Sequence, residues 1–369
     1  MKVLLLTTHL NVGGIGVYTT TLARYLKKEG VDVTIASSGG DLEERLKLDG
    51  VRHIKIDIKT KSEFGFKVWK ALPALNQLVK EEKFEIIHAQ TRVAQVLAYL
   101  SSKVTAVPFI STCHGFFKYQ RISRKVLPCW GEKVIAISES VKRHLVEDFH
   151  VAQDKTVLIY NGIELAGYSS GDGIKDTDLI KSLGLKDGDL VVGTIGRLSP
   201  VKGYKYLVSA FSDILLKNER LQLLFVGEGP EERHLKQQVE ELGIKDKVVF
   251  DPGRGPLKKY LALIDVFCLP SVHEGLGLSL MEAMASGKAC VASKVGGLAE
   301  LITDEENGLL VAPENARDLG AAISRLLEDV QFRQELAHSA KNKAMKSFSI
   351  VESAKKTAEA YEEVLDPKA

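Results

Sequence analysis

The sequence predicts an α/β protein made of two doubly wound domains, each with a parallel sheet covered by helices on both faces. Apolar, strand-like runs alternate with helical patterns along nearly the whole chain, which is typical of parallel strands joined by crossover helices. The 369 residues are more than one compact core normally holds. A stretch with little apolar periodicity, 166–188, separates two such series. We therefore predict two Rossmann-like domains joined by a linker.

The first series occupies residues 1–165 and contains seven apolar runs, as expected for strands buried on both faces. These runs are Val3–Thr8, Val31–Ser37, His53–Ile58, Glu85–Ala89, Phe109–Cys113, Val134–Ser138 and Val157–Tyr160. Helical patterns between them cover Val17–Lys28, Phe66–Glu82, Arg92–Ser101 and Ser140–Asp148.

The second series occupies residues 189–345 and has the same alternation. Its predicted strands are Leu190–Ile195, Leu221–Val226, Lys247–Phe250, Asp265–Leu269, Ala289–Ala292 and Leu309–Val311. Its predicted helices include Tyr204–Asn218, Glu231–Leu242, Leu257–Ile264, Leu278–Ser286 and Ala316–Glu328. A terminal helix follows in 346–369, with Ala354, Ala358, Tyr361 and Val364 on one apolar stripe. Periodicity alone leaves open which domain this helix joins.

Composition is that of a soluble globular protein, with 45% hydrophobic and 27% charged residues. No apolar run is long enough to span a bilayer, and the run Val3–Leu6 is too short for a secretory signal. The four cysteines are widely spaced, which argues against disulfides and zinc. We therefore expect a cytoplasmic protein.

Charge is unevenly distributed along the chain. Residues 1–165 hold 24 Lys and Arg against 17 Asp and Glu, a net of +7, whereas 166–369 hold 26 against 31, a net of −5. Random scatter of surface charge explains this equally well. The functional interpretation is that the first half meets an anionic partner.

The stretch Pro270–Gly287 contains the most informative pair of residues, Glu274 and Glu282. A buried strand precedes it, Gly275 and Gly277 allow a tight turn, and a short helix follows. Glu274 is then in the loop at the strand's carboxyl end and Glu282 in the second turn of the helix. A helix N-terminus suits a phosphate, and carboxylates on either side of it suit sugar hydroxyls. Sugar, phosphate and sugar in a row match a nucleotide-sugar.

Other strand-end loops of the second domain carry cations and glycines. Arg197 and Lys202 lie in the loop after Leu190–Ile195 and suit a diphosphate. Gly227 permits close approach of a ligand to the backbone, and Arg254 could stack on a base or pair with it. The Asp-x-Asp stretches 176–178 and 187–189 resemble a metal motif, but they lie in or beside the linker and are interpreted as caps and turns.

Two loops of the first domain are candidates for the same ligand. Gly13-Gly14 opens a helix after the first strand without the dinucleotide pattern G-x-G-x-x-G or its acidic partner, which disfavours hydride transfer. Gly14 can still offer backbone N–H groups to a phosphate. His114 follows Phe109–Cys113 directly. A single histidine there is more often structural, but near a nucleotide-sugar site it is a candidate catalytic residue.

The segment after His114 mixes aromatic and basic residues. A partly packed helix with a solvated face is one interpretation, and an acceptor or membrane-surface contact is the other. The candidate residues for that contact are Phe116, Lys118, Arg121, Arg124 and Lys125.

Taken together, these motifs resemble those of retaining glycosyltransferases of family 4, which have the GT-B fold. The resemblance covers almost the whole chain and is most specific at the E-x7-E pair Glu274 and Glu282. It also includes Asn161-Gly162-Ile163, which is similar to the family's interdomain junction, and it implies that the last helix crosses back to the first domain. Such a fold places the two sheets around a central cleft.

The resemblance also implies roles for individual residues. Glu282 would hold the ribose and Glu274 the donor sugar, while Arg197 and Lys202 would neutralise the diphosphate. Backbone N–H groups of Gly275, Leu276, Gly277, Leu278 and Ser279 would bind the phosphates, with Gly14 approaching from the first domain and His114 near the transferred sugar. The family needs no metal, and retention is usually drawn with the leaving phosphate accepting the acceptor's proton.

We therefore predict a metal-independent, retaining hexosyltransferase without a cofactor. We expect a UDP-sugar as donor ahead of a GDP-sugar, and a glycan or glycolipid acceptor in the synthesis of cell-envelope glycolipid, lipopolysaccharide or polysaccharide. An anionic acceptor and peripheral contact with the inner membrane fit the basic first half, and no nucleic-acid partner is expected. Two alternatives stay open: a nucleotide-sugar epimerase on the same fold, and a non-catalytic sugar-nucleotide binding protein.

Overall fold

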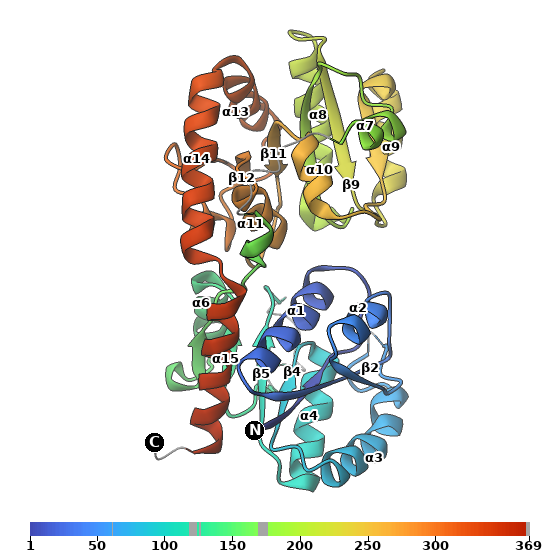
Figure 1. Cartoon of the computed structure of the whole chain (residues 1–369), viewed down its shortest axis with the longest axis vertical. Helices are drawn as coiled ribbons and strands as arrows, with labels where there is room; N and C mark the ends of the chain where they lie inside the picture. The colour runs from blue at the N-terminus through green and yellow to red at the C-terminus, as the bar shows by residue number, and fades with distance from the viewer. Residues whose placement is uncertain (61, 118–123, 125–126, 169–175, 367–369) are drawn as a thin grey trace. The chain divides into compact units, whose positions relative to one another are not determined.

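The computed structural model describes residues 1–60, 62–117, 124, 127–168 and 176–366. The chain divides into two compact units (Figure 1). The first comprises Met1–Gly162 together with Ile350–Ala369, and the second is Ile163–Ser349. Of the predicted linker, 166–188, residues 169–175 lie outside the described residues.

The first unit contains a seven-stranded sheet whose paired strands are all parallel, in the order β3-β2-β1-β4-β5-β6-β7. The strand order reverses between β1 and β4, and ligands of doubly wound sheets bind at the carboxyl ends of strands beside such a switch point. The strands are β1 (Lys2–Leu6), β2 (Asp32–Ser37), β3 (Arg52–Lys55), β4 (Ile86–Ala89), β5 (Phe109–Cys113), β6 (Val134–Ala136) and β7 (Thr156–Leu158). The helices are α1 (Gly14–Lys28), α2 (Glu43–Leu48), α3 (Phe66–Glu81), α4 (Arg92–Thr105), α6 (Glu139–Glu147) and α15 (Ile350–Leu365).

The C-terminal helix α15 belongs to the first unit and packs against α1. Buried polar groups also join it to the sheet and to α1. Tyr361 bonds to His88 Nδ1 at 2.7 Å, and Ser353 bonds to the Tyr18 hydroxyl at 3.0 Å. Burial lowers the pKa of His88 to about 3, so its imidazole is neutral and its hydrogen bonds stay in place at physiological pH.

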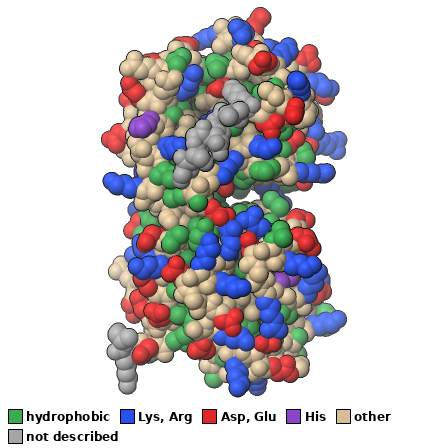
Figure 2. Space-filling view, in the orientation of Figure 1, with side chains coloured by type: hydrophobic (Ala, Val, Ile, Leu, Met, Phe, Trp, Pro, Cys, Tyr) green, Lys and Arg blue, Asp and Glu red, His purple; other side chains and the backbone are tan. Residues whose placement is uncertain are grey.

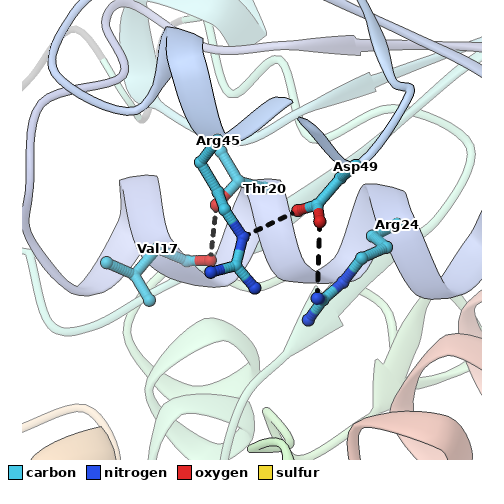
Figure 3. A network of polar contacts seen from close by, with 5 residues as sticks. All are labelled: Val17, Thr20, Arg24, Arg45 and Asp49. Carbon is cyan, nitrogen blue, oxygen red and sulfur yellow. Dashed lines mark hydrogen bonds and ion pairs between the residues drawn. The ribbon is translucent and has the colours of Figure 1, made fainter. Parts of the chain in front are cut away.

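Asp49 connects the short helix α2 to α1. Asp49, just after α2, accepts hydrogen bonds from Arg45 at 3.0 Å and from Arg24 of α1 at 3.5 Å (Figure 3). Within α1, the Thr20 hydroxyl donates to the Val17 carbonyl at 2.9 Å. Of these contacts, the Arg24–Asp49 bond is the one that joins the two helices.

The second unit contains a six-stranded parallel sheet in the order β10-β9-β8-β11-β12-β13. Its switch point lies between β8 and β11, so the loops that follow these two strands start from neighbouring positions. The strands are β8 (Leu190–Ile195), β9 (Leu221–Val226), β10 (Val248–Asp251), β11 (Val266–Leu269), β12 (Ala289–Ser293) and β13 (Leu309–Val311). The α-helices are α7 (Thr177–Leu183), α8 (Tyr204–Leu215), α9 (Glu232–Glu241), α10 (Leu257–Leu263), α11 (Leu278–Ala285), α12 (Leu298–Leu301), α13 (Ala316–Glu328) and α14 (Val330–Ser347).

The predicted fold class, two Rossmann-like parallel-sheet units, is confirmed. All thirteen predicted strands are present, displaced by at most a few residues at their ends. Asp176 caps α7 by accepting bonds from the backbone N–H groups of Asp178 and Leu179, as its interpretation as a capping residue requires. The six-residue helix α2 was not predicted, because it is too short to show a helical period.

Candidate active site

The site is built where the loops after β8 and β11 meet at the carboxyl edge of the second sheet. Backbone hydrogen bonds join the two loops, because Val272 N and His273 N both donate to the Val201 carbonyl, at 2.8 and 3.4 Å. Val201 is in a single 3₁₀ turn, η3 (Pro200–Lys202), which turns the chain into α8. The adjacent loops therefore hold Lys202 beside the Glu274 loop.

Lys202 and Glu274 form an ion pair, with the Lys202 Nζ 2.5 Å from Glu274 Oε2. The fully buried Ser271 donates a further hydrogen bond to the same oxygen at 3.2 Å. Burial works to lower the pKa of Lys202, but the neighbouring carboxylate outweighs it and the pKa is raised overall. The lysine is therefore a fixed ammonium, positioned through Glu274, and it keeps donors for an anionic ligand.

Two arginines of this edge stay available to a ligand. Arg197, directly after β8 and Gly196, and Arg254, after β10, are both exposed. Among the residues that the structure describes, neither has a carboxylate partner. The sequence-predicted cations therefore divide into one paired ammonium and two unpaired guanidinium groups, the latter suited to bidentate contact with phosphate.

The N-terminus of α11 supplies further anion-binding groups. Gly277, at φ +101°, is the residue before the helix, and no acidic side chain lies in the first turn. Leu280 N and Met281 N bond back to the Gly277 carbonyl at 3.0 and 3.1 Å. The N–H groups before them, from Gly275 to Ser279, are those predicted to bind phosphate, and the helix dipole favours negative charge there.

Glu282, one turn further into α11, is half-buried. Burial raises the pKa of its carboxyl to about 7. Within the described ranges, its carboxylate has neither a hydrogen-bond nor an ion-pair partner. Such a carboxylate gains from hydroxyl donors supplied by a ligand, because an unpaired buried charge is costly.

Tyr168 lies close to Glu282 and was not predicted as a site residue. It is in the 3₁₀ turn η2 (Leu165–Tyr168), and the pKa of its phenol is raised by burial and by the Glu282 charge. The Lys258 ammonium lies 5.2 Å from the centre of the Tyr168 ring. The only signal in the sequence is an aromatic residue shortly after Asn161-Gly162-Ile163, which is too weak to nominate it.

Glycines allow the strand-end loops to approach one another. A Cβ at Gly227 would lie 2.3 Å from the Gly196 carbonyl oxygen, one at Gly297 would lie 2.4 Å from that of Gly275, and one at Gly203 would lie 2.1 Å from that of Pro270. Larger residues at these positions would push the loops apart. Gly227, predicted as a donor-site residue, therefore packs the β9 loop against the β8 loop.

Replacing Gly203 by Ala is expected to lower the free energy of unfolding by about 2–4 kcal/mol, since strain at φ +65° combines with the contact to Pro270. Gly243→Ala is the matched control. Its φ is +67°, but nothing lies within 4 Å of the added Cβ, so it should cost about 1 kcal/mol. Urea denaturation of both variants measures the difference. Equal losses would show that the loop contact contributes nothing.

Two predicted residues belong to the first unit. Gly14 is the first residue of α1. His114, after β5, donates a hydrogen bond from its Nε2 to Gln90 Oε1 at 2.9 Å, and its ring meets the Tyr18 ring edge-on at 5.7 Å. Burial lowers the pKa of His114 to about 3, so the imidazole is neutral at physiological pH.

The predicted acceptor or membrane segment is only partly described. Lys118, Arg121 and Lys125 lie outside the described residues. Phe116 is 38% exposed, but Arg124 is only 3% exposed, with its guanidinium carbon 3.5 Å from the centre of the Phe117 ring. The expectation that Arg124 faces an acceptor or membrane surface is therefore corrected, because stacking on aromatic rings draws the planar cation inward.

Two further features concern membranes and metals. Over the described part of the chain, no helix combines the length and apolarity needed to cross a bilayer. Within the same ranges, no three His, Cys, Asp or Glu side chains gather in a way that could hold a metal ion.

The sequence was compared with protein-family models and with known proteins. The model of "Glycosyltransferase Family 4" matches residues 12–166, and that of "Glycosyl transferases group 1" matches residues 175–343. The chain is 27% identical to an Escherichia coli UDP-Gal:alpha-D-GlcNAc-diphosphoundecaprenol alpha-1,3-galactosyltransferase, over 94% of this chain and 93% of that one. It is 25% identical to the N-acetyl-alpha-D-glucosaminyl L-malate synthase of Bacillus anthracis, over 93% and 92% of the two chains.

Solved structures of other proteins share this fold. HepE of Anabaena, solved in complex with UDP-glucose, superposes with a TM-score of 0.86 at 24% identity, over 98% of this chain and 99% of that one. This confirms the GT-B fold, and the two family models together account for nearly all of the sequence. The chain belongs to glycosyltransferase family 4.

Proposed function

We propose that the protein transfers a hexosyl group from a UDP-sugar to a hydroxyl of an anionic acceptor, with retention of configuration and without a metal ion. The observation that supports this most directly is the arrangement at the edge of the second sheet. The Lys202–Glu274 pair, the α11 N-terminus and the half-buried Glu282 provide, in order, groups for a sugar, a diphosphate and a ribose.

The main requirement of the reaction is to stabilise the negative charge that develops on the leaving diphosphate. As the bond between the sugar's anomeric carbon and the phosphate oxygen breaks, its electron pair passes to the diphosphate. Lys202, Arg197 and the N–H groups at the start of α11 stabilise that charge. The acceptor oxygen attacks from the same face and gives its proton to the leaving phosphate. Glu274 holds Lys202 and binds donor-sugar hydroxyls.

These fixed cations supply the charge that a divalent metal would otherwise provide, which is the reason for proposing metal independence. His114 and Gly14 stay proposals for the first unit. A neutral His114 suits a hydrogen bond to a sugar hydroxyl better than a charge-stabilising role, because its imidazole carries no positive charge at physiological pH.

The relatives support a UDP-sugar and an anionic acceptor. The E. coli protein is named for UDP-Gal and HepE binds UDP-glucose. The named acceptors, a diphosphoundecaprenol-linked sugar and L-malate, both carry negative charge. The net charge of +7 over residues 1–165 suits such acceptors. We therefore place the reaction in the synthesis of a cell-envelope glycolipid or polysaccharide, at the cytoplasmic face of the membrane.

A thermal-shift panel of UDP, GDP and ADP, with their sugars, tests the donor. A ligand at about 100 times its Kd adds roughly 2.7 kcal/mol of stability, which raises the melting temperature by several degrees. We expect UDP and a UDP-hexose to give the largest shift. If none of the three nucleotides shifts the transition, the donor site is wrong.

Donor consumption with and without an acceptor then separates the reaction types. A transferase releases UDP in proportion to the acceptor glycosylated, whereas an epimerase converts the UDP-sugar without an acceptor and without releasing UDP. Binding without any turnover in either condition would identify a non-catalytic sugar-nucleotide binding protein.

A further inference from the structure

The start of α3 exposes three large aromatic side chains that the site does not use. Phe66 is 79% exposed, Trp69 is 53% exposed and Phe64, in the preceding turn, is 45% exposed. The opposite face of the helix is buried, with Val68 and Leu75 fully enclosed. The apolar stripe of the helix thus packs against the core. The aromatic side chains on its other face, which proteins usually bury, are exposed to solvent.

Lysines flank these aromatic residues in the sequence. Residues 59–70 contain four lysines and one acidic residue, Glu63. Lys59, Lys67 and Lys70 are exposed, and Lys67 pairs with Asp57 at 2.8 Å. Glu63 forms a nearly buried ion pair with Arg92 at 2.6 Å. Its negative charge is therefore neutralised by Arg92 and does not offset the charge of the exposed lysines.

Basic residues alone do not distinguish this region. Lys and Arg side chains are spread over the visible face of the first unit, interspersed with Asp and Glu (Figure 2). The combination of exposed rings with lysines is what matches a bilayer interface, where aromatic rings sit at the level of the head groups and cations meet anionic lipid.

The position of α3 fits a role close to the acceptor. Because α3 follows β3, its N-terminus lies at the carboxyl edge of the first sheet, where the loops carrying Gly14 and His114 also begin. Arg92, besides holding Glu63, donates to the carbonyls of Leu127 and Pro128 at 2.7 and 2.6 Å. The turn that carries Phe64 is therefore tied to the chain that leaves the predicted acceptor segment.

We propose that this α3 patch, formed by Phe64, Phe66, Trp69, Lys59 and Lys70, docks the protein on the surface of an anionic phospholipid bilayer. A second copy of the chain is a poorer occupant, because self-association would bring two sets of lysines together. The proposal deepens the proposed function, since it rests on a lipid-linked acceptor for its purpose, but docking is measured without donor or acceptor.

Trp69 provides a direct readout. The chain has two tryptophans, and Trp130 is only 7% exposed, so a change of emission on adding vesicles reports Trp69. We expect a shift to shorter wavelength with vesicles of phosphatidylglycerol and phosphatidylcholine, quenching by brominated lipid, and reversal by high salt. Pure phosphatidylcholine should give a much weaker response.

Vesicle co-sedimentation of variants locates the surface. Phe66→Ser with Trp69→Ser should lower the partition coefficient roughly a hundredfold, and Lys59→Gln with Lys70→Gln roughly tenfold. The matched control, Leu216→Ser with Lys217→Gln, changes an 87%-exposed leucine and an exposed lysine of the second unit and should bind like the parent.

The outcomes decide between the explanations. Absence of binding to anionic vesicles at low salt overturns the proposal, as does binding that the α3 substitutions leave unchanged. A change in molar mass by light scattering, without a change in vesicle binding, would assign the patch to self-association. The melting temperature of the same variants, measured with and without UDP, shows whether they are folded. If UDP causes no shift, the donor-site proposal fails, and the vesicle-binding result is unaffected.

Discussion

Glu282→Gln is expected to stabilise the unliganded protein above pH 7 and to remove most of its affinity for UDP. Burial raises the pKa of this carboxyl to about 7, so between the unfolded value and 7 the native state binds more protons than the unfolded state. The stability due to Glu282 is therefore fully present below the unfolded pKa and is lost as the pH rises through 7. At pH 8 the unpaired charge costs on the order of 2 kcal/mol, which a neutral glutamine avoids.

The same substitution should damage ligand binding. A carboxylate accepts charge-assisted hydrogen bonds from ribose hydroxyls worth about 1.5–3 kcal/mol, so the affinity for UDP should fall roughly ten- to a hundredfold. Denaturation in urea at pH 5 and pH 8, with calorimetric titration of UDP, measures both effects.

Glu274→Gln is the matched control for Glu282. It should keep the affinity for free UDP and impair transfer, because Glu274 is assigned to the donor sugar and to Lys202. Equal effects of the two substitutions on free UDP would show that the division of the pair between sugar and ribose is wrong.

Lys202→Met is expected to lower kcat/KM by about 10²–10³, the usual loss when a preorganised group that stabilises developing charge is removed. Two effects add in the same direction. The diphosphate loses a fixed cation, and Glu274, which bonds to Lys202 at 2.5 Å, becomes an unpaired negative charge beside the leaving group. Steady-state kinetics with the UDP-sugar identified by thermal shift measure the loss.

Two further variants separate these effects. Lys202→Arg keeps the charge and should retain more activity than the methionine variant. Combining Lys202→Met with Glu274→Gln should give less than the sum of the single losses, since the pair acts as a unit. A loss below about fivefold for Lys202→Met would exclude Lys202 from leaving-group stabilisation.

The strands were predictable because both faces of a parallel strand are covered, so each strand reads as a short apolar run such as Leu221–Val226. Strand ends then located the loops that carry Arg197, Lys202 and Glu274, and the structure brings Lys202 and Glu274 into contact. That Lys202 bonds to Glu274 was not predicted, because the contact depends on the register of two loops separated by more than sixty residues.

The errors and omissions concern side chains whose surroundings come from distant parts of the chain. Arg124 seemed solvent-facing in a basic stretch, but its environment is set by Phe117 and Trp130. Tyr168 becomes a site residue only because α11 brings Glu282 close to it. The helix α3 was predicted correctly, but the exposure of its aromatic face was not. That exposure becomes clear only in the structure, where Val68 and Leu75 are the residues that pack into the core.

The return of α15 to the first unit has a consequence for biosynthesis. The first unit is completed only by residues from 350 onward, after the whole of residues 163–349 has been made. At typical translation rates, this delay is roughly 10–40 s. During that time His88 lacks the Tyr361 hydroxyl and Tyr18 lacks Ser353. The second unit, whose residues are contiguous, can therefore finish folding on the ribosome before the domain that precedes it in the chain.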